Sequence, residues 1–220
     1  MIIRFLDIVF SFLALIILCP LLVPIALLLR ITGEGEIFYR QRRIGKSGVE
    51  FFILKFATMI KNSPNMGSGT VTLANDPRVL PVGRVLRATK VNELPQLFNV
   101  LLGDMSLIGP RPQTQECFSH FPLNMHDEIL SLRPGLSGIG SIIYRDEESL
   151  LAEQADPIHY YNHVLMPNKA LIEVWYVRNT NLKNYALLIW YTLLAVVNPR
   201  SVILSKFIER VKLEVNVINE

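Results

Sequence analysis

Residues 84–112 read RVLRATKVNELPQLFNVLLGDMSLIGPRP, and this segment organises the rest of the chain. Apolar side chains recur at helical spacing from Leu94 to Leu101, which predicts a helix over residues 81–102. Gly103 ends that helix, and the prolines of GDMSLIGPRP stiffen the loop that follows. The segment therefore combines an amphipathic helix with a rigid loop, an arrangement that holds polar side chains beside an apolar surface.

The same segment carries carboxylates and guanidinium groups. Glu93 and Asp104 are candidate ligands of Mg²⁺, because proteins bind this ion through one or two carboxylates together with substrate phosphates. Arg87 and Arg111, with Arg133 further along the chain, are candidate phosphate-binding residues, since a guanidinium fork matches phosphate geometry. These residues together predict a site for a diphosphate and a divalent cation.

A long apolar segment precedes this region. From Ile8 to Leu29 there are 22 residues without a charge, and a straight helix of that length, about 33 Å, spans a bilayer. Pro20 and Pro24 interrupt it, each at about 3 kcal/mol in a helix interior. Two topologies remain. One is a span with its N-terminus outside, and the other is a proline-bent hairpin that returns to the same face. Charge counting favours the span, because five basic residues follow the segment: Arg30, Arg40, Arg42, Arg43 and Lys46.

Composition narrows the class of protein. A chain of 220 residues suits one domain with a short appendage, and 50% hydrophobic residues with a positive mean hydropathy favour membrane contact. The net charge of +3 is too small to indicate nucleic-acid binding, and no nucleic-acid motif is present. Cys19 and Cys117 are the two cysteines, so a disulfide framework is not expected.

The remaining segments predict a mixed fold. Residues 37–39 and 51–54 are short β-prone runs joined by a glycine-containing turn, which predicts a β-hairpin. Residues 61–76 are polar and rich in Gly, Ser and Asn, and they predict a loop. Residues 157–177 predict a helix. Residues 185–197 are 13 uncharged residues, too short to cross a bilayer, and predict a buried or membrane-surface helix.

Two further clusters are interpreted as structural. The acidic run Asp146, Glu147 and Glu148 is typical of the solvated first turn of a helix rather than of a metal site. His159 and His163 have the spacing of two imidazoles on one helix face, but no third ligand is apparent, so we do not expect a zinc site.

Several motifs together resemble those of the bacterial sugar transferases, the small monotopic phosphoglycosyl transferases. They are the apolar N-terminal run, FYRQRRIGKSG, KFATM, ELPQLFNVLLGDMSLIGPRP and RPGLSG. The resemblance implies an α/β, mostly helical fold. It further implies a re-entrant membrane helix hairpin over 1–31, broken at Cys19-Pro20, and a compact cytosolic domain over 32–200. That domain should hold a short β-hairpin and amphipathic membrane-surface helices, followed by a C-terminal tail over 201–220.

The resemblance also implies an activity. Members of this family transfer a sugar phosphate from a nucleoside-diphosphate sugar, here a UDP-sugar, to polyprenyl phosphate such as undecaprenyl phosphate, with Mg²⁺. The products are a polyprenyl-diphosphate sugar and a nucleoside monophosphate, in the priming step of surface polysaccharide or glycoconjugate synthesis. The implied location is the bacterial inner membrane, with the catalytic domain against membrane lipid and facing the cytoplasm. A homo-oligomer is left open. The alternative is an inactive membrane-associated partner or scaffold of such a pathway.

The chain departs from the family at the catalytic pair. The family has an Asp-Glu pair whose Asp attacks the β-phosphate, whereas this chain has Asn92-Glu93. By resemblance Glu93 matches the metal position, and Arg87 and Arg111 match phosphate-binding positions. Because an amide is a far weaker nucleophile than a carboxylate, three accounts stay open. The lipid phosphate attacks directly, or Glu93 is the nucleophile, or the chemistry is lost. Ala57 in KFATM also replaces a usual Arg.

Overall fold

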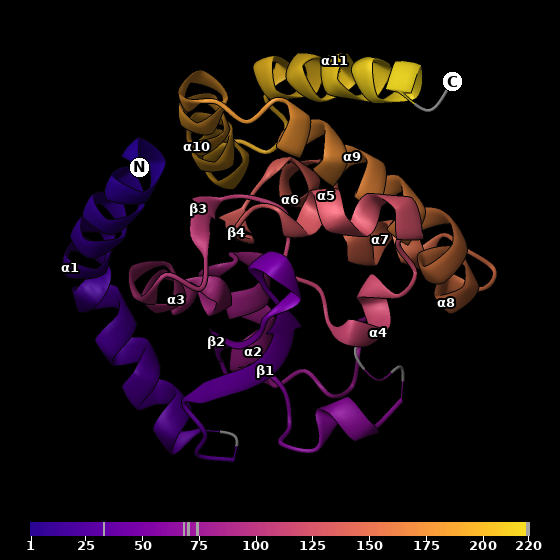
Figure 1. Ribbon diagram of the computed structural model, residues 1–220. Helices are drawn as coiled ribbons and strands as arrows, with labels where there is room; N and C mark the ends of the chain where they lie inside the picture. The colour runs from indigo at the N-terminus through magenta and orange to yellow at the C-terminus, as the bar shows by residue number, and fades with distance from the viewer. Residues whose placement is uncertain (33, 68, 70, 74, 219–220) are drawn as a thin grey trace.

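The computed structural model describes residues 1–32, 34–67, 69, 71–73 and 75–218, and shows a mostly helical domain with two small sheets (Figure 1). This confirms the mostly helical α/β fold. Residues 33, 68, 70 and 74, in the predicted turn and loop, and 219–220, in the predicted tail, lie outside the described residues.

In chain order the elements are α1 (Ile2–Ile31), β1 (Phe38–Ile44), β2 (Glu50–Phe56), α2 (Pro81–Ala88), α3 (Gln96–Leu102), β3 (Ser106–Ile108), α4 (Gln115–Phe118), α5 (His126–Leu130), β4 (Gly135–Ser137), α6 (Ile139–Ile143), α7 (Glu147–Ala152), α8 (Pro157–Tyr160), α9 (Met166–Arg178), α10 (Leu182–Val197) and α11 (Val202–Ile218), with the 3₁₀ turns η1 (Lys46–Gly48), η2 (Ser63–Asn65), η3 (Val91–Glu93) and η4 (Leu123–Met125) and the π-helical turn η5 (Tyr161–Leu165).

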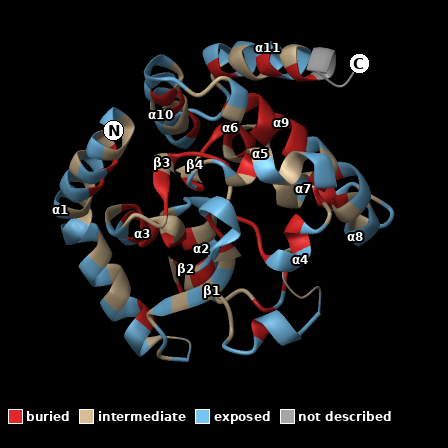
Figure 2. Ribbon diagram, in the orientation of Figure 1, coloured by how far each residue is buried: buried red, intermediate tan, exposed pale blue. Residues whose placement is uncertain are grey.

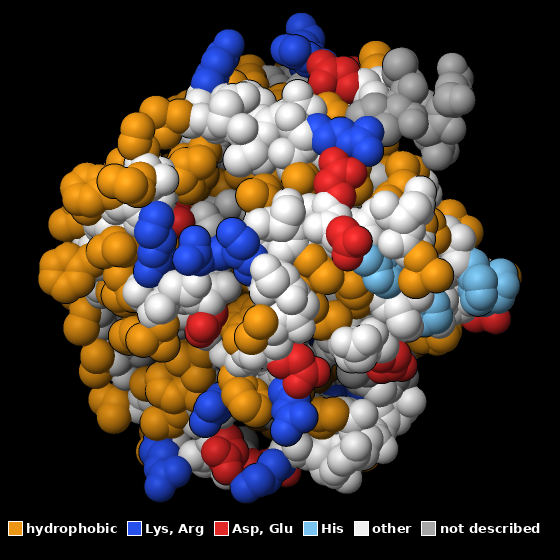
Figure 3. Space-filling view, in the orientation of Figure 1, with side chains coloured by type: hydrophobic (Ala, Val, Ile, Leu, Met, Phe, Trp, Pro, Cys, Tyr) orange, Lys and Arg blue, Asp and Glu red, His pale blue; other side chains and the backbone are white. Residues whose placement is uncertain are grey.

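The apolar N-terminal segment forms one continuous helix, α1, that curves along one side of the domain (Figure 1). The helix is not interrupted at Cys19-Pro20, where the predicted hairpin over 1–31 was expected to break, and its path through a membrane stays a prediction. Pro20 and Pro24 lie inside the helix, which bends without turning back. It is the one helix of the described residues that is long and apolar enough to cross a membrane. Its outer face gives the domain an apolar margin (Figure 3).

Both ends of α1 contact the same domain. Near its start, Arg4 donates hydrogen bonds to the Val100 and Leu101 carbonyls at 2.5 and 2.9 Å, and these carbonyls belong to α3. The buried Asp7 carboxylate accepts bonds from three donors of β3 and α10: Ser106 Oγ, the Leu107 amide and Tyr185 Oη. Near its end, Leu29 is buried in an apolar cluster with side chains of β2 and α2. Both ends of α1 are thus packed against the domain.

The predicted β-hairpin is confirmed. β1 and β2 pair antiparallel from Phe38 opposite Phe56 to Ile44 opposite Glu50, and η1 provides the turn. Asn99 of α3 extends the hydrogen bonding at the edge of β2, because its side chain accepts from the Leu54 amide and donates to the Phe52 carbonyl. The hairpin is in this way fastened to α3.

The predicted helix over 81–102 is interrupted. Residues 81–88 form α2 and residues 96–102 form α3, and between them lies η3, which contains Asn92 and Glu93. Lys90 adopts a left-handed conformation with φ of 61°, which ends the first helix, and Pro95 directly precedes the second. The apolar periodicity was correct for α3, but it gave no sign of this break.

The predicted loop GDMSLIGPRP and the motif RPGLSG each contribute a short strand, and the two strands pair. β3, from GDMSLIGPRP, and β4, from RPGLSG, form a parallel pair. The backbones approach closely there, since a Cβ on Gly135 would lie 2.2 Å from the Gly109 nitrogen, and a Cβ on Gly109 would lie 2.4 Å from the Arg133 carbonyl oxygen. The glycines of both motifs are therefore required by backbone contact.

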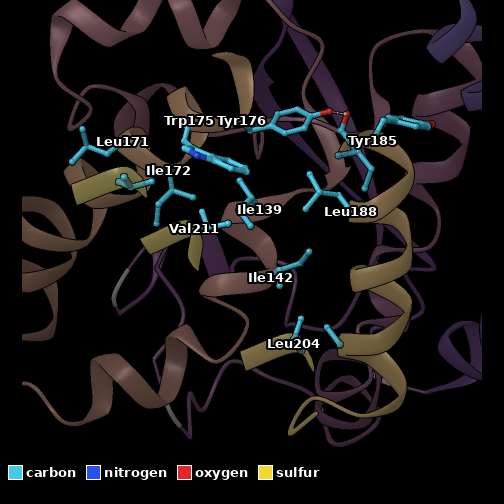
Figure 4. Close-up of a cluster of buried hydrophobic side chains, with 13 residues drawn as sticks. Ile139, Ile142, Leu171, Ile172, Trp175, Tyr176, Tyr185, Leu188, Leu204 and Val211 are labelled. Atoms are coloured by element: carbon cyan, nitrogen blue, oxygen red, sulfur yellow. Dashed lines mark hydrogen bonds between the residues drawn. The ribbon is translucent and has the colours of Figure 1, made fainter. Parts of the chain in front are cut away.

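The C-terminal helices enclose the main core. The predicted helix over 157–177 appears as α8, η5 and α9, and α9 is buried along most of its length (Figure 2). Side chains from α6, α9, α10 and α11 meet in one apolar cluster around Trp175 and Tyr176 (Figure 4). Within the predicted C-terminal tail over 201–220, residues 202–218 form α11, and Leu204 and Val211 of this helix are buried in the cluster.

Candidate functional site

A polar cavity of about 400 Å³ lies between the β-hairpin, α2, η3 and the start of α7. Glu34 and Glu36, directly after α1, line it, so one part of the cavity lies next to the apolar helix. Eight Lys or Arg side chains and five Glu side chains line its wall. This excess of positive charge suits an anionic ligand. The basic lining residues are Arg40, Arg43, Lys55, Lys61, Arg87, Lys90, Arg111 and Lys169.

Glu93 lies at the centre of a three-residue ion cluster in this cavity. Its Oε1 accepts hydrogen bonds from Lys55 Nζ and from an Arg111 terminal nitrogen, both at 2.9 Å. Burial by itself would raise the pKa of Glu93, but Arg111 and Lys55 outweigh this effect and hold the pKa well below its ordinary value. Glu93 is therefore a stable carboxylate, which makes it a weak nucleophile.

The pKa values of the two cations of the cluster are shifted in opposite directions. Desolvation lowers the pKa of Lys55 to about 8, although Glu93 opposes the shift. The pKa of Arg111 is raised, mainly by the charge of Glu93. Arg111 also donates to Ser141 Oγ at 3.4 Å, and its backbone amide donates to Glu173 Oε1 at 3.1 Å. Arg111 is thus held from two sides with its guanidinium beside Glu93.

Asn92 precedes Glu93 in the short turn η3, and both residues line the same cavity. It is 6% exposed, and its Oδ1 has no hydrogen-bond partner among the described residues. A buried amide oxygen without a partner costs free energy unless a ligand satisfies it. The cavity wall therefore contains a neutral amide at the position where the resemblance implies a nucleophilic Asp.

Two more cations of the cavity are paired with the acidic run of α7. Arg87 donates to Glu148 Oε1 at 2.7 Å, and Lys169 of α9 donates to Glu147 Oε2. The acidic run does start a helix, as interpreted from the sequence, but Glu147 and Glu148 are also ion-paired in the cavity wall, where the Glu148 side chain is 47% exposed. Lys55 and Lys169 were not singled out from the sequence, and Glu147 was interpreted there as structural. For Lys55, the motif KFATM was the available signal.

The structure does not bring Arg133 and Asp104 to this cavity. The exposed Arg133 donates to the Gly103 carbonyl at 2.8 Å, where it caps the C-terminus of α3. Asp104 accepts from the Asn99 amide group at 3.3 Å. Of the predicted site residues, Glu93, Asn92, Arg87 and Arg111 lie together, while these two face the α3 terminus.

The donors for a divalent cation are correspondingly few. No group of three His, Cys, Asp or Glu side chains among the residues described is arranged to hold a metal ion. Glu93 and Asn92 both line the cavity and carry oxygen atoms of the type that Mg²⁺ prefers, with Asn92 Oδ1 itself buried and without a partner among the described residues. Because Mg²⁺ usually takes its other ligands from water and substrate phosphate, this pair fits a site completed by the substrate.

The predicted loop over 61–76 is held in place by one buried arginine. Arg78 is 4% exposed and pairs with Asp76. Its guanidinium also donates to carbonyl groups at Ser63, Met66, Gly69 and Val71. Since Ser63, Gly69 and Val71 line the cavity, Arg78 sets the shape of this wall.

Comparison with known proteins connects this cavity to one family. The family model described as bacterial sugar transferase matches residues 1–199. The chain is 37% identical over 175 residues to the exopolysaccharide production protein ExoY of Sinorhizobium fredii, covering 71% of this chain and 75% of that protein. It is 38% identical over 145 residues to a UDP-N-acetylgalactosamine-undecaprenyl-phosphate N-acetylgalactosaminephosphotransferase of Aeromonas hydrophila, covering 64% and 34%.

A third relative is an undecaprenyl-phosphate galactose phosphotransferase of Salmonella typhimurium, 34% identical over 196 residues, covering 82% of this chain and 37% of the relative. The chain therefore spans three quarters of one relative and about a third of the two longer ones. The family match and the apolar helix α1 together indicate membrane association. With a family model that matches nine tenths of its length, the chain belongs to the bacterial sugar transferases and is a phosphoglycosyl transferase, as its motifs predicted.

Proposed function

We propose that this protein transfers a sugar phosphate from a UDP-sugar to undecaprenyl phosphate, giving undecaprenyl-diphosphate sugar and UMP. The observation that carries the proposal is the cavity in which Glu93, Lys55 and Arg111 form one ion cluster next to the end of α1. A cationic cavity beside an apolar helix suits a water-soluble diphosphate donor and a lipid acceptor. The names of the relatives from Aeromonas hydrophila and Salmonella typhimurium support both substrate classes.

We infer that the lipid phosphate attacks the donor directly. An oxygen of the lipid phosphate forms a bond to the β-phosphorus, and the bond from that phosphorus to the bridging oxygen breaks. UMP leaves with the bridging oxygen, and no net proton transfer is needed. Asn92 supports this route because a neutral amide cannot form the acyl phosphate that an Asp carboxylate would form. Glu93 supports it as well, since two cations bind the same oxygen of its carboxylate.

The residues of the cavity have distinct tasks in this route. Arg111 and Lys55 neutralise phosphate charge, and Glu93 keeps both cations in position before substrate binds. Asn92 supplies a hydrogen-bond or metal acceptor at the reacting phosphate. Mg²⁺ held by Glu93 and Asn92 Oδ1 would supply further neutralisation of the diphosphate.

We further propose that the catalytic domain faces the cytoplasm at the bacterial inner membrane. Because Arg4 and Leu29 both contact the domain, the two ends of α1 belong on the same side of the bilayer. That arrangement supports a re-entrant path in spite of the continuous helix. Single cysteines at residues 2 and 31 of the protein in vesicles should react with an impermeant maleimide from the same side. Reaction from opposite sides would contradict the topology.

The experiment that tests the activity uses the purified full chain in detergent micelles. A panel of UDP-sugars is offered with and without undecaprenyl phosphate, and UMP release is measured. Release should require both substrates. A donor that is chiral at the β-phosphorus should give inverted configuration, since one displacement inverts and two retain. Retention would refute direct attack. Absence of UMP release with every donor, while the protein still binds undecaprenyl phosphate, would favour the inactive partner.

A further inference from the structure

The first turn of α7 closes the cavity with two carboxylates. Glu148 pairs with Arg87 of α2 at 2.7 Å, and Glu147 pairs with Lys169 of α9. The two cations lie 82 residues apart in the chain and belong to different walls of the cavity. The start of α7 therefore joins two walls through ion pairs, each of which uses a cation that a bound anion could also use.

Lys169 is in an unusual place for a lysine. It is 5% exposed, and its ammonium group lies 5.4 Å from the centre of the Tyr161 ring and 5.6 Å from that of Tyr144. Burial lowers its pKa, and Glu147 opposes that shift. A buried cation needs an anion beside it, because their attraction offsets the free energy that is lost when the cation leaves water. Glu147 provides that anion in this structure.

The Glu148 pair has a different character. The Glu148 side chain is 47% exposed and that of Arg87 is 25% exposed, so water weakens the attraction between them. At the far end of α7, Leu151 is fully buried in the apolar cluster of Phe118 and Tyr161. The helix is thus anchored at its end by packing and joined to the cavity walls at its start by exchangeable ion pairs.

We propose that Lys169 is a further ligand of the donor's diphosphate, together with Arg87, and that Glu147 and Glu148 occupy these two cations until the diphosphate displaces them. This inference rests on the proposed function, because a diphosphate donor is the displacing anion. A diphosphate carries negative charge on two adjacent groups, and it can satisfy cations on two walls at once. The start of α7 then moves off the walls while its Leu151 end stays in place.

The test measures binding to the full chain in detergent micelles by calorimetry. UDP and inorganic pyrophosphate are titrated into the wild type and into Glu147→Gln, Glu148→Gln and Glu153→Gln. Glu153 is the matched control, because it is exposed at the C-terminal end of the same helix. Freeing a cation should tighten binding about three- to tenfold in the first two variants, and by less than about twofold in the control. Lys169→Met should weaken pyrophosphate binding by about tenfold or more, and Lys169→Arg should retain most of it.

Hydrogen exchange of the wild type provides a second measurement that needs no variant. The peptide over 145–152 should exchange faster when UDP is saturating, whereas uridine, which lacks phosphate, should leave it unchanged. Unchanged or slower exchange with bound UDP overturns the proposal. So does equal affinity of all three glutamine variants while the wild type binds UDP, and in that case the proposed function stands. A wild type that binds neither UDP nor pyrophosphate overturns both.

Discussion

Glu93→Gln tests the central ion cluster. The side chain of Glu93 is 14% exposed, and removing its charge leaves Lys55 and Arg111 without their shared anion. Loss of one partner from a buried ion pair costs about 3–5 kcal/mol. Lys55 limits this cost, because its pKa of about 8 is already low and falls further without Glu93, so it loses its proton near neutral pH. We therefore expect the lower end, about 3 kcal/mol at pH 7 and less at pH 9.

For a chain of this length, that loss lowers Tm by about 6–12 °C, which thermal unfolding in detergent measures directly. UMP release with both substrates should fall at least about 100-fold, because the cations that neutralise the diphosphate are no longer positioned. The matched control is Glu128→Gln, which breaks a short ion pair with Arg178 at 2.7 Å on the exposed surface. It should cost less than about 1 kcal/mol and leave turnover unchanged. A Glu93→Gln protein as stable as the Glu128→Gln control, with turnover within about tenfold of wild type, would refute the reasoning.

Three further predictions concern other parts of the structure. Asn92→Asp restores a carboxylate that faces the cavity, so UMP release without lipid and a covalent phosphosugar adduct should appear in intact mass spectra; the absence of any adduct would count against the assignment of this position. Glu173 is fully buried, and burial raises the pKa of its carboxyl to about 7. The folded protein therefore binds the Glu173 proton more tightly than the unfolded chain does. The free energy of unfolding should fall by up to about 3 kcal/mol as pH rises from about 4.5 through 7. Glu173→Gln should remove that fall in Tm, and an unchanged pH profile would contradict the buried carboxyl as its source. Arg78→Lys keeps the charge but loses the planar fork that binds four carbonyls. Limited proteolysis within 61–76 should therefore become faster than in the wild type, and KM for the donor should rise several-fold.

Much of the local structure could be predicted from the sequence. Apolar spacing and turn residues predicted the hairpin, the helical stretch from α8 to α9, and α10. These signals depend only on residues that are close together in the sequence. The break at Lys90 could not, because a left-handed lysine has no sequence signal in an otherwise helical pattern. That break matters for the site, since two adjacent residues of a regular helix point about 100° apart, whereas Asn92 and Glu93 face the same cavity.

Site residues were predictable where a motif contained them. Glu93, Arg87 and Arg111 were found in one motif and do meet in space, but Asp104, from the same motif, points to α3. Lys169 could not be predicted as a site residue from the sequence. An isolated lysine in an apolar helix does not reveal whether it is solvated or buried, and only the packing of α9 against α7 shows the latter.

The sequence by itself determined the family, the long apolar N-terminal helix and the Asn92-Glu93 pair, because each is a property of residue identity and short spacing. The tertiary structure decided which charges meet. Glu93 binds cations from a strand and a loop, and the parallel pairing of β3 with β4 packs two glycine motifs backbone to backbone. Electrostatic contacts depend on distance and burial, and both arise only when segments far apart in the chain pack together.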